Sequence, residues 1–169
     1  RLASDFFLKD PKKAVAPMTV SLLFNTAAFM LYGGQEWGEN GMEIEGYSGA
    51  DGRSSIFDFS SLHAKNRQIY KIYKELMQIS ADPIFSEGET YDLTFVNKDN
   101  TNFSPAEQFA FMRGHNGRMA LVVANFSDMP VTVKVNIPDD AYRYFGFEKC
   151  TTFEAKISIA ANGNAIIFS

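Results

Sequence analysis

Cysteine and histidine are scarce in this sequence, and long apolar or basic runs are missing. Of the 169 residues, 1 is cysteine (Cys150) and 2 are histidine (His63 and His115). A single cysteine excludes an internal disulfide, and these three residues are too few for a histidine–cysteine zinc site. No apolar stretch approaches the ~20 residues of a membrane span. No basic run suited to a polyanion occurs. We therefore expect no zinc site, no nucleic-acid partner and no membrane partner, and we assign no residue as a metal ligand.

The bulk composition is that of a globular protein. The chain is 46% hydrophobic and 14% aromatic, with a formal net charge of -4, which distinguishes it from a disordered polypeptide. This length suits one domain or two small ones. The opening "RLASDFF" is neither a start methionine nor a signal peptide, so we expect the chain to be cut from something longer. It identifies no compartment.

A helix is predicted near the N-terminus. Asp10 stands before Pro11, which is an N-cap followed by proline at the first helical position. Apolar residues come next at helical spacing: Ala14, Met18 and Leu22. The predicted helix runs from about Pro11 to about Asn25 and is kinked or tightened near Pro17.

The next two segments predict a strand and a second helix. The apolar run from Phe29 to Tyr32 is closed by Gly33 and Gly34, as in a strand buried on both faces of a parallel sheet. The later run "HAKNRQIYKIYKELMQIS" predicts an amphipathic helix. Its apolar residues are three and four apart: Ile69, Ile72, Tyr73, Leu76 and Ile79. The order of helix, buried strand, loop and helix indicates an α/β unit.

The pattern changes at Asp82-Pro83. From there to Ser169 the sequence consists of short alternating runs separated by turn residues. The runs are "TYDLTFVN", "EQFAFMRG", "RMALVVANF", "VTVKVNIP", "AKISI" and "NAIIFS". They predict an antiparallel all-β sandwich of about six to eight strands. We place the boundary near Ala81, with residues 1–81 and 82–169 packed closely because no flexible linker separates them. His115, in the turn "GHNGR", is expected to be exposed.

The loop after the predicted strand is crowded with carboxylates, glycines and aromatic rings. Its acidic residues are Glu36, Glu39, Glu43, Glu45 and Asp51. Ligands in parallel α/β folds bind beyond the carboxyl ends of strands. Three interpretations remain open on composition: a solvated acidic loop, a calcium site, although the spacing matches no EF-hand, and a sugar-binding edge of carboxylates beside aromatic faces.

The order of the residues adds a family resemblance. "NTAAFMLYGGQEWGE" followed by "DGRSSIFDF" closely resembles the segment along the eighth barrel strand of α-amylase-type enzymes, glycoside hydrolase family 13. The family pattern there is an apolar strand, an aromatic residue, glycine, an acidic or amide residue, glutamate and glycine. The matching positions are Tyr32, Gly34, Gln35, Glu36 and Gly38. The stretch that precedes the last barrel helix is similar to Asp51, Gly52, Arg53, Ile56 and Phe57.

The resemblance implies an α+β fragment: the last α/β unit of a TIM-type barrel in residues 1–81, followed by the domain C antiparallel β-sandwich in residues 82–169. Family members cleave or transfer α-glucosidic bonds with retention, using two carboxyl groups about 5 to 5.5 Å apart. The intact enzyme would therefore act on an α-glucan or a maltooligosaccharide. "RLAS" is similar to the residues just after the last catalytic motif of the family, so no catalytic residue lies in this chain, and we expect it to be inactive alone. The sequence leaves the cofactor unknown.

Five residues are candidates for substrate binding by this resemblance: Arg1, Glu36, Trp37, Asp51 and Arg53. Arg1 would lie near the bound glucosyl unit, or fray as a chain end. Glu36 would order the loop by hydrogen bonding or line the site. Trp37 would stack on a sugar or belong to the core. Asp51 and Arg53 would pair with each other or contact sugar directly.

Two further hypotheses do not involve catalysis. The chain could work alone as a carbohydrate-binding or interaction module without catalysis. A barrel remnant whose strand has lost its neighbours would also expose open edges and apolar helix faces, which favours self-association.

Overall fold

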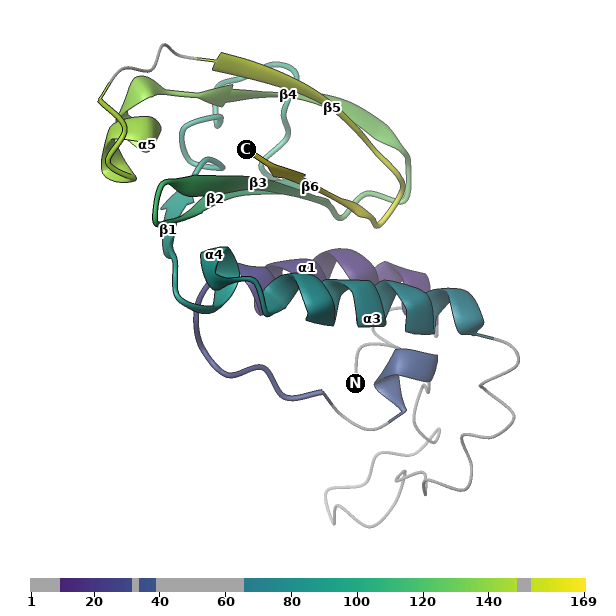
Figure 1. Cartoon of the computed structure of the whole chain (residues 1–169). Helices are drawn as coiled ribbons and strands as arrows, with labels where there is room; N and C mark the ends of the chain where they lie inside the picture. The colour runs from purple at the N-terminus through teal and green to yellow at the C-terminus, as the bar shows by residue number, and fades with distance from the viewer. Residues whose placement is uncertain (1–9, 32–33, 39–65, 149–152) are drawn as a thin grey trace, which may run out of the picture.

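Helices and antiparallel strands form separate layers in this protein (Figure 1). The computed structural model describes residues 10–31, 34–38, 66–148 and 153–169. Arg1, Asp51 and Arg53 therefore lie outside the described residues. Within the described part, no helix is long and apolar enough to cross a membrane.

The first predicted helix forms in two parts. A 3-10 turn, η2 (Pro11–Ala14), leads into the α-helix α1 (Val15–Leu23). The side chain of Asp10 caps η2 by accepting a hydrogen bond from Lys12 N at 3.0 Å. Pro17 lies in the first turn of α1, where a missing backbone N–H removes no hydrogen bond within the helix. The tightening predicted near Pro17 is thus the 3-10 turn η2, which ends at Ala14.

The second predicted helix is confirmed as α3 (Arg67–Ser80). Ile69, Tyr73 and Leu76 are its buried residues, at the spacing of one helix face. The short helix α4 (Pro83–Ser86) comes almost directly after it, capped by Asp82, whose Oδ1 accepts from Ile84 N at 3.0 Å. The change in sequence pattern at Asp82-Pro83 therefore coincides with the start of a short helix.

Among the described residues that follow α4, six strands form two antiparallel sheets. They are β1 (Glu89–Asp92), β2 (Gln108–His115), β3 (Arg118–Asn125), β4 (Val131–Ile137), β5 (Phe153–Ile159) and β6 (Asn164–Phe168). The larger sheet has the order β1-β2-β3-β6, and the smaller one pairs β4 with β5. The chain is thus a small α+β protein with antiparallel sheets.

The two sheets share one hydrophobic core. Alternate residues of the larger sheet, such as Ala110, Met112 and Leu121, are buried in the same cluster as Val135 and Ile157 of the smaller sheet. Figure 1 shows the β4–β5 pair lying across one face of the larger sheet. The buried apolar residues of β4 and β5 alternate with half-buried or exposed ones because only one face of that pair is covered.

The other face of the larger sheet packs against the helices. Phe111 and Val122 are partners in the β2–β3 ladder, and both belong to a buried cluster with Met18 and Leu23 of α1 and Tyr73 of α3. In Figure 1, α1 and α3 lie side by side beneath this sheet. Covering both faces explains why β2 and β3 are buried along nearly their whole length.

Arg113 of β2 ties the helical layer to the sheet. Its side chain is fully buried and donates hydrogen bonds to Thr90 Oγ1 and to four main-chain carbonyl oxygens. These carbonyls belong to Phe24, Ile84, Phe85 and Gly88. Among the described residues, Arg113 forms no ion pair. Its guanidinium therefore holds the end of α1 and the α4–β1 connection by their backbone.

The prediction of a buried strand from Phe29 to Tyr32 is wrong over the residues that the structure describes. Residues 28–31 have no regular secondary structure, and Met30 is 87% exposed. Phe29 and Leu31 pack against the helix-side core instead. The prediction assumed cover on both faces, yet no described strand lies alongside to pair with this backbone. Tyr32 is outside the described residues.

Two details of the β-rich half also differ from the sequence prediction. The run from Thr90 to Asn97 is a strand only as far as Asp92, whose Oδ1 accepts from Thr94 N at 2.7 Å and turns the chain. Asn97 then takes the place of a strand residue, exchanging hydrogen bonds of 2.8 and 3.0 Å with the backbone of Asn136. The segment "PDDAYRY" contains a helix, α5 (Asp139–Tyr144).

Candidate functional site

The described part of the candidate loop is one tight turn between two glycines. The 3-10 helix η3 (Gln35–Trp37) begins after Gly34 and ends at Gly38, whose φ angles are 93° and 73°. Glycine reaches these left-handed angles without the steric cost that other residues incur. The two glycines therefore allow Gln35, Glu36 and Trp37 to turn back toward the helices.

Gly38 also permits a close approach to the N-terminal turn of the chain. A Cβ atom on Gly38 would lie 2.9 Å from Cγ of Pro11 and 3.3 Å from Nδ2 of Asn66. Real Cβ atoms do not approach neighbours as closely as the first distance. The turn is thus lodged between η2 and the residue that precedes α3.

The side chain of Glu36 stabilises this turn by a hydrogen bond to the turn's backbone. Its Oε2 accepts a hydrogen bond from Gly34 N at 3.0 Å, and the side chain is half-buried. A carboxylate that accepts from a backbone amide two residues earlier holds the loop in one conformation. This geometry is that of loop ordering, one of the two roles that the sequence left open for Glu36.

Trp37 lies flat against α3. Its ring stacks on that of Tyr70 with centroids 4.2 Å apart and an angle of 7° between the planes. Tyr70 itself is 39% exposed. One face of the indole is therefore occupied by a protein ring, which leaves only the opposite face for a sugar or for other contacts.

Gln35 joins the turn to the core of the helical layer. It is buried, and its Nε2 donates to the hydroxyl of Tyr73 at 3.1 Å. Burial raises the pKa of Tyr73, the hydrogen bond from Gln35 partly opposes this, and the charge of Glu36 raises the pKa further. The hydroxyl therefore stays protonated at neutral pH, and the contact is a neutral hydrogen bond.

Of the five predicted binding residues, the structure places Glu36 and Trp37 on one turn of 3-10 helix. Arg1, Asp51 and Arg53 lie outside the described residues, so their approach to this turn stays a prediction. Sequence reasoning missed Tyr70 and Tyr73 as the partners of this turn. Their spacing of three on α3 was the available signal, because it puts both rings on one helix face.

The chemistry available in the described part of this site is binding and ordering. Glycosidic retention needs two carboxyl groups, and η3 contributes one, that of Glu36. The described residues contain no group of three His, Cys, Asp or Glu side chains placed to hold a metal ion.

Solved structures of carbohydrate-active proteins share this fold. AmyP in complex with maltose matches 94% of the chain with a TM-score of 0.61 and 16% identity. The debranching enzyme of Nostoc punctiforme, from an acarbose-soaked crystal, matches 91% with a TM-score of 0.59 and 18% identity. Amy13B of Eubacterium rectale matches 94% with a TM-score of 0.54 and 19% identity.

These matches cover a minority of each solved structure. The chain spans 34% of AmyP, 28% of the debranching enzyme and 34% of Amy13B. At these identities the likeness establishes a shared fold. By sequence, no protein-family model and no curated protein matches the chain.

Proposed function

We propose that the chain is the C-terminal portion of a retaining α-glucan glycoside hydrolase of the α-amylase type. The observation that carries this proposal is a match over 94% of the chain to 34% of AmyP, a protein solved with maltose. A variant of AmyP was also solved with maltotriose. The sequence resemblance at Gly34 to Gly38 points independently to the same class of enzyme.

In this proposal, residues 1–81 complete a catalytic barrel and residues 82–169 form the domain C that comes after it. The role of Phe29 to Tyr32 as the last barrel strand then depends on the rest of the barrel. A parallel strand needs hydrogen-bonding neighbours on both sides, and a whole barrel takes about 250 residues. An irregular backbone at Phe29–Leu31 is compatible with a segment that lacks these neighbours.

The candidate binding residues take supporting roles in this scheme. Glu36 fixes the turn after the last strand, and Trp37 seals that turn against α3. We propose that Arg1, Asp51 and Arg53 complete the glucan contacts in the intact enzyme. None of these residues supplies the nucleophile or the acid, so the isolated chain has no activity of its own.

The test is hydrolysis of maltoheptaose by two purified proteins, the 169-residue chain and the longest polypeptide encoded in its reading frame. We expect turnover only from the longer protein. Turnover by rigorously purified short chain would refute the assignment of catalysis to upstream residues. An inactive longer protein that lacks an Asn-His-Asp triplet shortly before Arg1 would refute the enzyme itself.

A second candidate is a stand-alone carbohydrate-binding module. The observation that supports its stand-alone character is that the chain builds two buried clusters, one on each face of the larger sheet. Calorimetric titration with maltooligosaccharides tests this function, provided that the reading frame begins at or near Arg1. Under the enzyme hypothesis the frame extends well upstream instead.

A further inference from the structure

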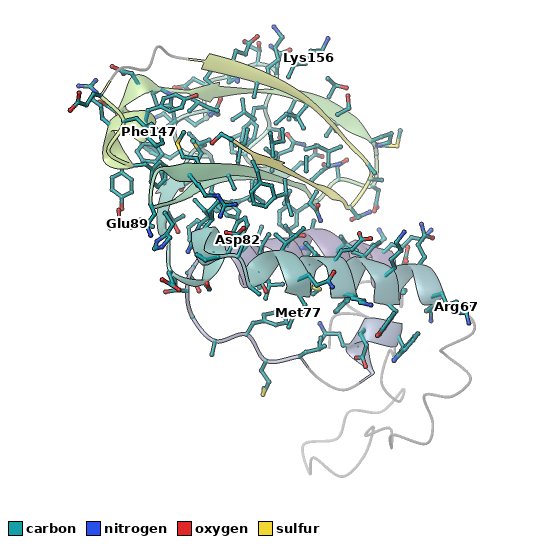
Figure 2. The ribbon with its side chains drawn as sticks, viewed as in Figure 1. Arg67, Met77, Asp82, Glu89, Phe147 and Lys156 are labelled. Carbon is teal, nitrogen blue, oxygen red and sulfur yellow. The ribbon has the colours of Figure 1, made fainter. Side chains whose placement is uncertain are left out.

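A polar hollow lies at one end of the larger sheet, where three connections meet. Its volume is about 410 Å³, within the ~300 to 1,000 Å³ of small-molecule pockets. The residues that line it are Glu87, Glu89, Gly114, His115, Asn116, Tyr144, Phe145 and Gly146. Glu89 lies on the side of the molecule where α5 packs (Figure 2).

The hollow is far from the η3 turn. Trp37 of η3 stacks on Tyr70 in the first half of α3, whereas the hollow begins at Glu87, beyond α4. A helix of the length of α3 extends about 21 Å. Neither Glu36 nor Trp37 lines the hollow, so any ligand here would occupy a second site.

Gly114 and Phe145 fix the shape of the hollow. A Cβ atom on Gly114 would come within 2.2 Å of the Phe145 ring, so that ring packs directly on the backbone of β2. This contact anchors the end of α5 against the sheet. Beyond it, Gly146 has a φ of 85° and faces open space. This part of the wall is therefore shaped by apolar packing of Phe145 on the backbone of β2.

Tyr144 gives the hollow an aromatic face. The ring makes edge-type contacts with Tyr91 and Phe145 at centroid distances of 5.7 and 5.2 Å. These contacts hold it in place, yet Tyr144 is 51% exposed. Within the described residues, its hydroxyl has no hydrogen-bond partner. A fixed and half-exposed ring is the surface on which the apolar face of a pyranose can rest.

Hydrogen-bonding groups of both kinds surround this ring. The carboxylate of Glu89 forms no ion pair or hydrogen bond with any other described residue. Glu87 Oε2 is 3.7 Å from His115 Nε2, and Asn116 Nδ2 is 2.8 Å from the same nitrogen. His115 is less exposed than its turn position predicted, since its side chain is only 23% accessible. Acceptors and donors therefore lie side by side, as the hydroxyl groups of a sugar require.

We propose that this hollow binds a short α-glucan, with one glucosyl unit on Tyr144 and its hydroxyls bonded to Glu87, Glu89 and Asn116. The choice of an α-glucan rests on the proposed function. An aromatic ring beside two carboxylates could also attract an organic cation. The amide and imidazole favour a sugar, because a cation has no use for hydrogen-bond donors.

The experiment is a calorimetric titration of the 169-residue chain with maltoheptaose. We expect weak binding that falls at least tenfold in Tyr144→Ala and is retained in Tyr144→Phe, which keeps the ring. Phe95→Ala is the matched control, since Phe95 is 70% exposed but does not line the hollow. Glu89→Gln preserves the shape and should weaken binding severalfold. Thermal melts show whether each variant is folded.

Several outcomes would overturn the proposal. These are no heat with millimolar maltoheptaose, equal losses in Tyr144→Ala and Phe95→Ala, or binding of benzyltrimethylammonium in place of the sugar. If Tyr144→Ala does not fold, the test rests on the binding measured for Glu89→Gln and Tyr144→Phe instead. The hydrolysis assay on the longer protein separates the two proposals. If the longer protein is active but the 169-residue chain does not bind maltoheptaose, only the proposed binding site is refuted. If the chain binds maltoheptaose but the longer protein is inactive, only the enzyme proposal is refuted.

Discussion

Arg113 is the residue on which the junction between the layers most depends. It donates hydrogen bonds to Phe24 O, Phe85 O and Gly88 O, each at 2.7 Å, from a fully buried position. Hydrogen bonds from a charged donor each contribute about 1.5 to 3 kcal/mol. A lysine has three donors on one nitrogen and cannot reproduce the forked geometry.

We therefore predict that Arg113→Lys lowers the free energy of unfolding by about 3 kcal/mol. Urea denaturation measures this loss. Arg118→Lys is the control, because the Arg118 side chain is 53% exposed and pairs with Asp82 at the surface, where an ion pair contributes at most about 1 kcal/mol. Equal effects of the two substitutions would contradict the role assigned to Arg113.

Asp82 makes the stability of the chain depend on acid. The backbone amide of Ile84 and the guanidinium of Arg118 both bond its carboxylate, and they hold the pKa of Asp82 below its ordinary value. A lowered pKa in the folded state stabilises the fold above the unfolded pKa of about 3.9. That contribution disappears as the pH falls through the folded value.

We expect Asp82→Ala to lower the melting temperature at pH 7, since loss of an N-cap costs about 1 kcal/mol. The difference in melting temperature between the variant and the parent chain should shrink steadily as the pH is lowered toward 2. Asp99→Ala, which removes a carboxylate without described contacts, should show no such convergence. A difference that stays constant from pH 7 to pH 3 would show that the carboxylate charge is irrelevant.

At the scale of elements, helix α5 docks on β2 through the contact of Phe145 with Gly114. Gly114→Ala would force a methyl group into the ring, and overpacking of this kind costs about 1 to 3 kcal/mol. The double variant Gly114→Ala with Phe145→Ala should lose less stability than the sum of the two single changes. Additive losses in urea denaturation would mean that the two residues act independently.

Tryptophan fluorescence reports on the docking of η3 on α3, because Trp37 is the single tryptophan of the sequence. Removing the stacked ring in Tyr70→Ala should shift its fluorescence to longer wavelength and increase quenching by acrylamide. Tyr70→Phe keeps a ring of the same size and should leave both unchanged. If Tyr70→Ala has the parent spectrum, the stack does not hold the turn in solution.

Elements were predictable where a local signal dominated. Helix α3 and strands β2 and β3 are indicated by periodicity and by the residues between them. Helix α5 was missed because Pro138, Asp139 and Asp140 resemble a turn, although acidic residues also favour the first turn of a helix. The strand at Phe29 was predicted from its apolar run, but a strand also needs partners, which a local pattern does not reveal.

Across the whole molecule, the larger sheet serves two cores at once. Its helix side buries Phe111, Ala120 and Val122 against α1, α3 and α4. Residues 82–169 alone would expose that side as an apolar patch next to open strand edges, and such surfaces associate. We predict that this half self-associates in sedimentation velocity at concentrations where the full chain is less associated. A monodisperse monomer of residues 82–169 would show that the helices are dispensable.

The layered arrangement was only partly predictable. Turn chemistry and alternation indicated antiparallel strands after Asp82, and capping residues and apolar periodicity predicted the helices before it. Contacts over long sequence distances carried no signal, among them Lys13 with Asp128 and Asn164 with Thr19. For the same reason, the sequence pointed to the carboxylates of one loop but not to the hollow around Tyr144. Self-association of the full chain stays a prediction, and Met30, 87% exposed, is where an apolar contact could begin.

The manner in which Arg113 holds the junction has a consequence for how freely this chain can vary. The guanidinium contacts main-chain oxygens on the helical side, and every amino acid carries such an oxygen. A substitution at Phe24 therefore leaves the acceptor in place while the path of the backbone is kept, although it removes the contacts of that ring with Phe109 and Phe111. Gly88 does not tolerate a side chain, because a Cβ atom there would lie 2.2 Å from the carbonyl oxygen of Ile84. Apart from the hydroxyl of Thr90, the joint depends on where backbone carbonyls lie. A different helical segment could therefore be grafted onto the same sheet if it presents its carbonyls in the same places and keeps a glycine at the position of Gly88.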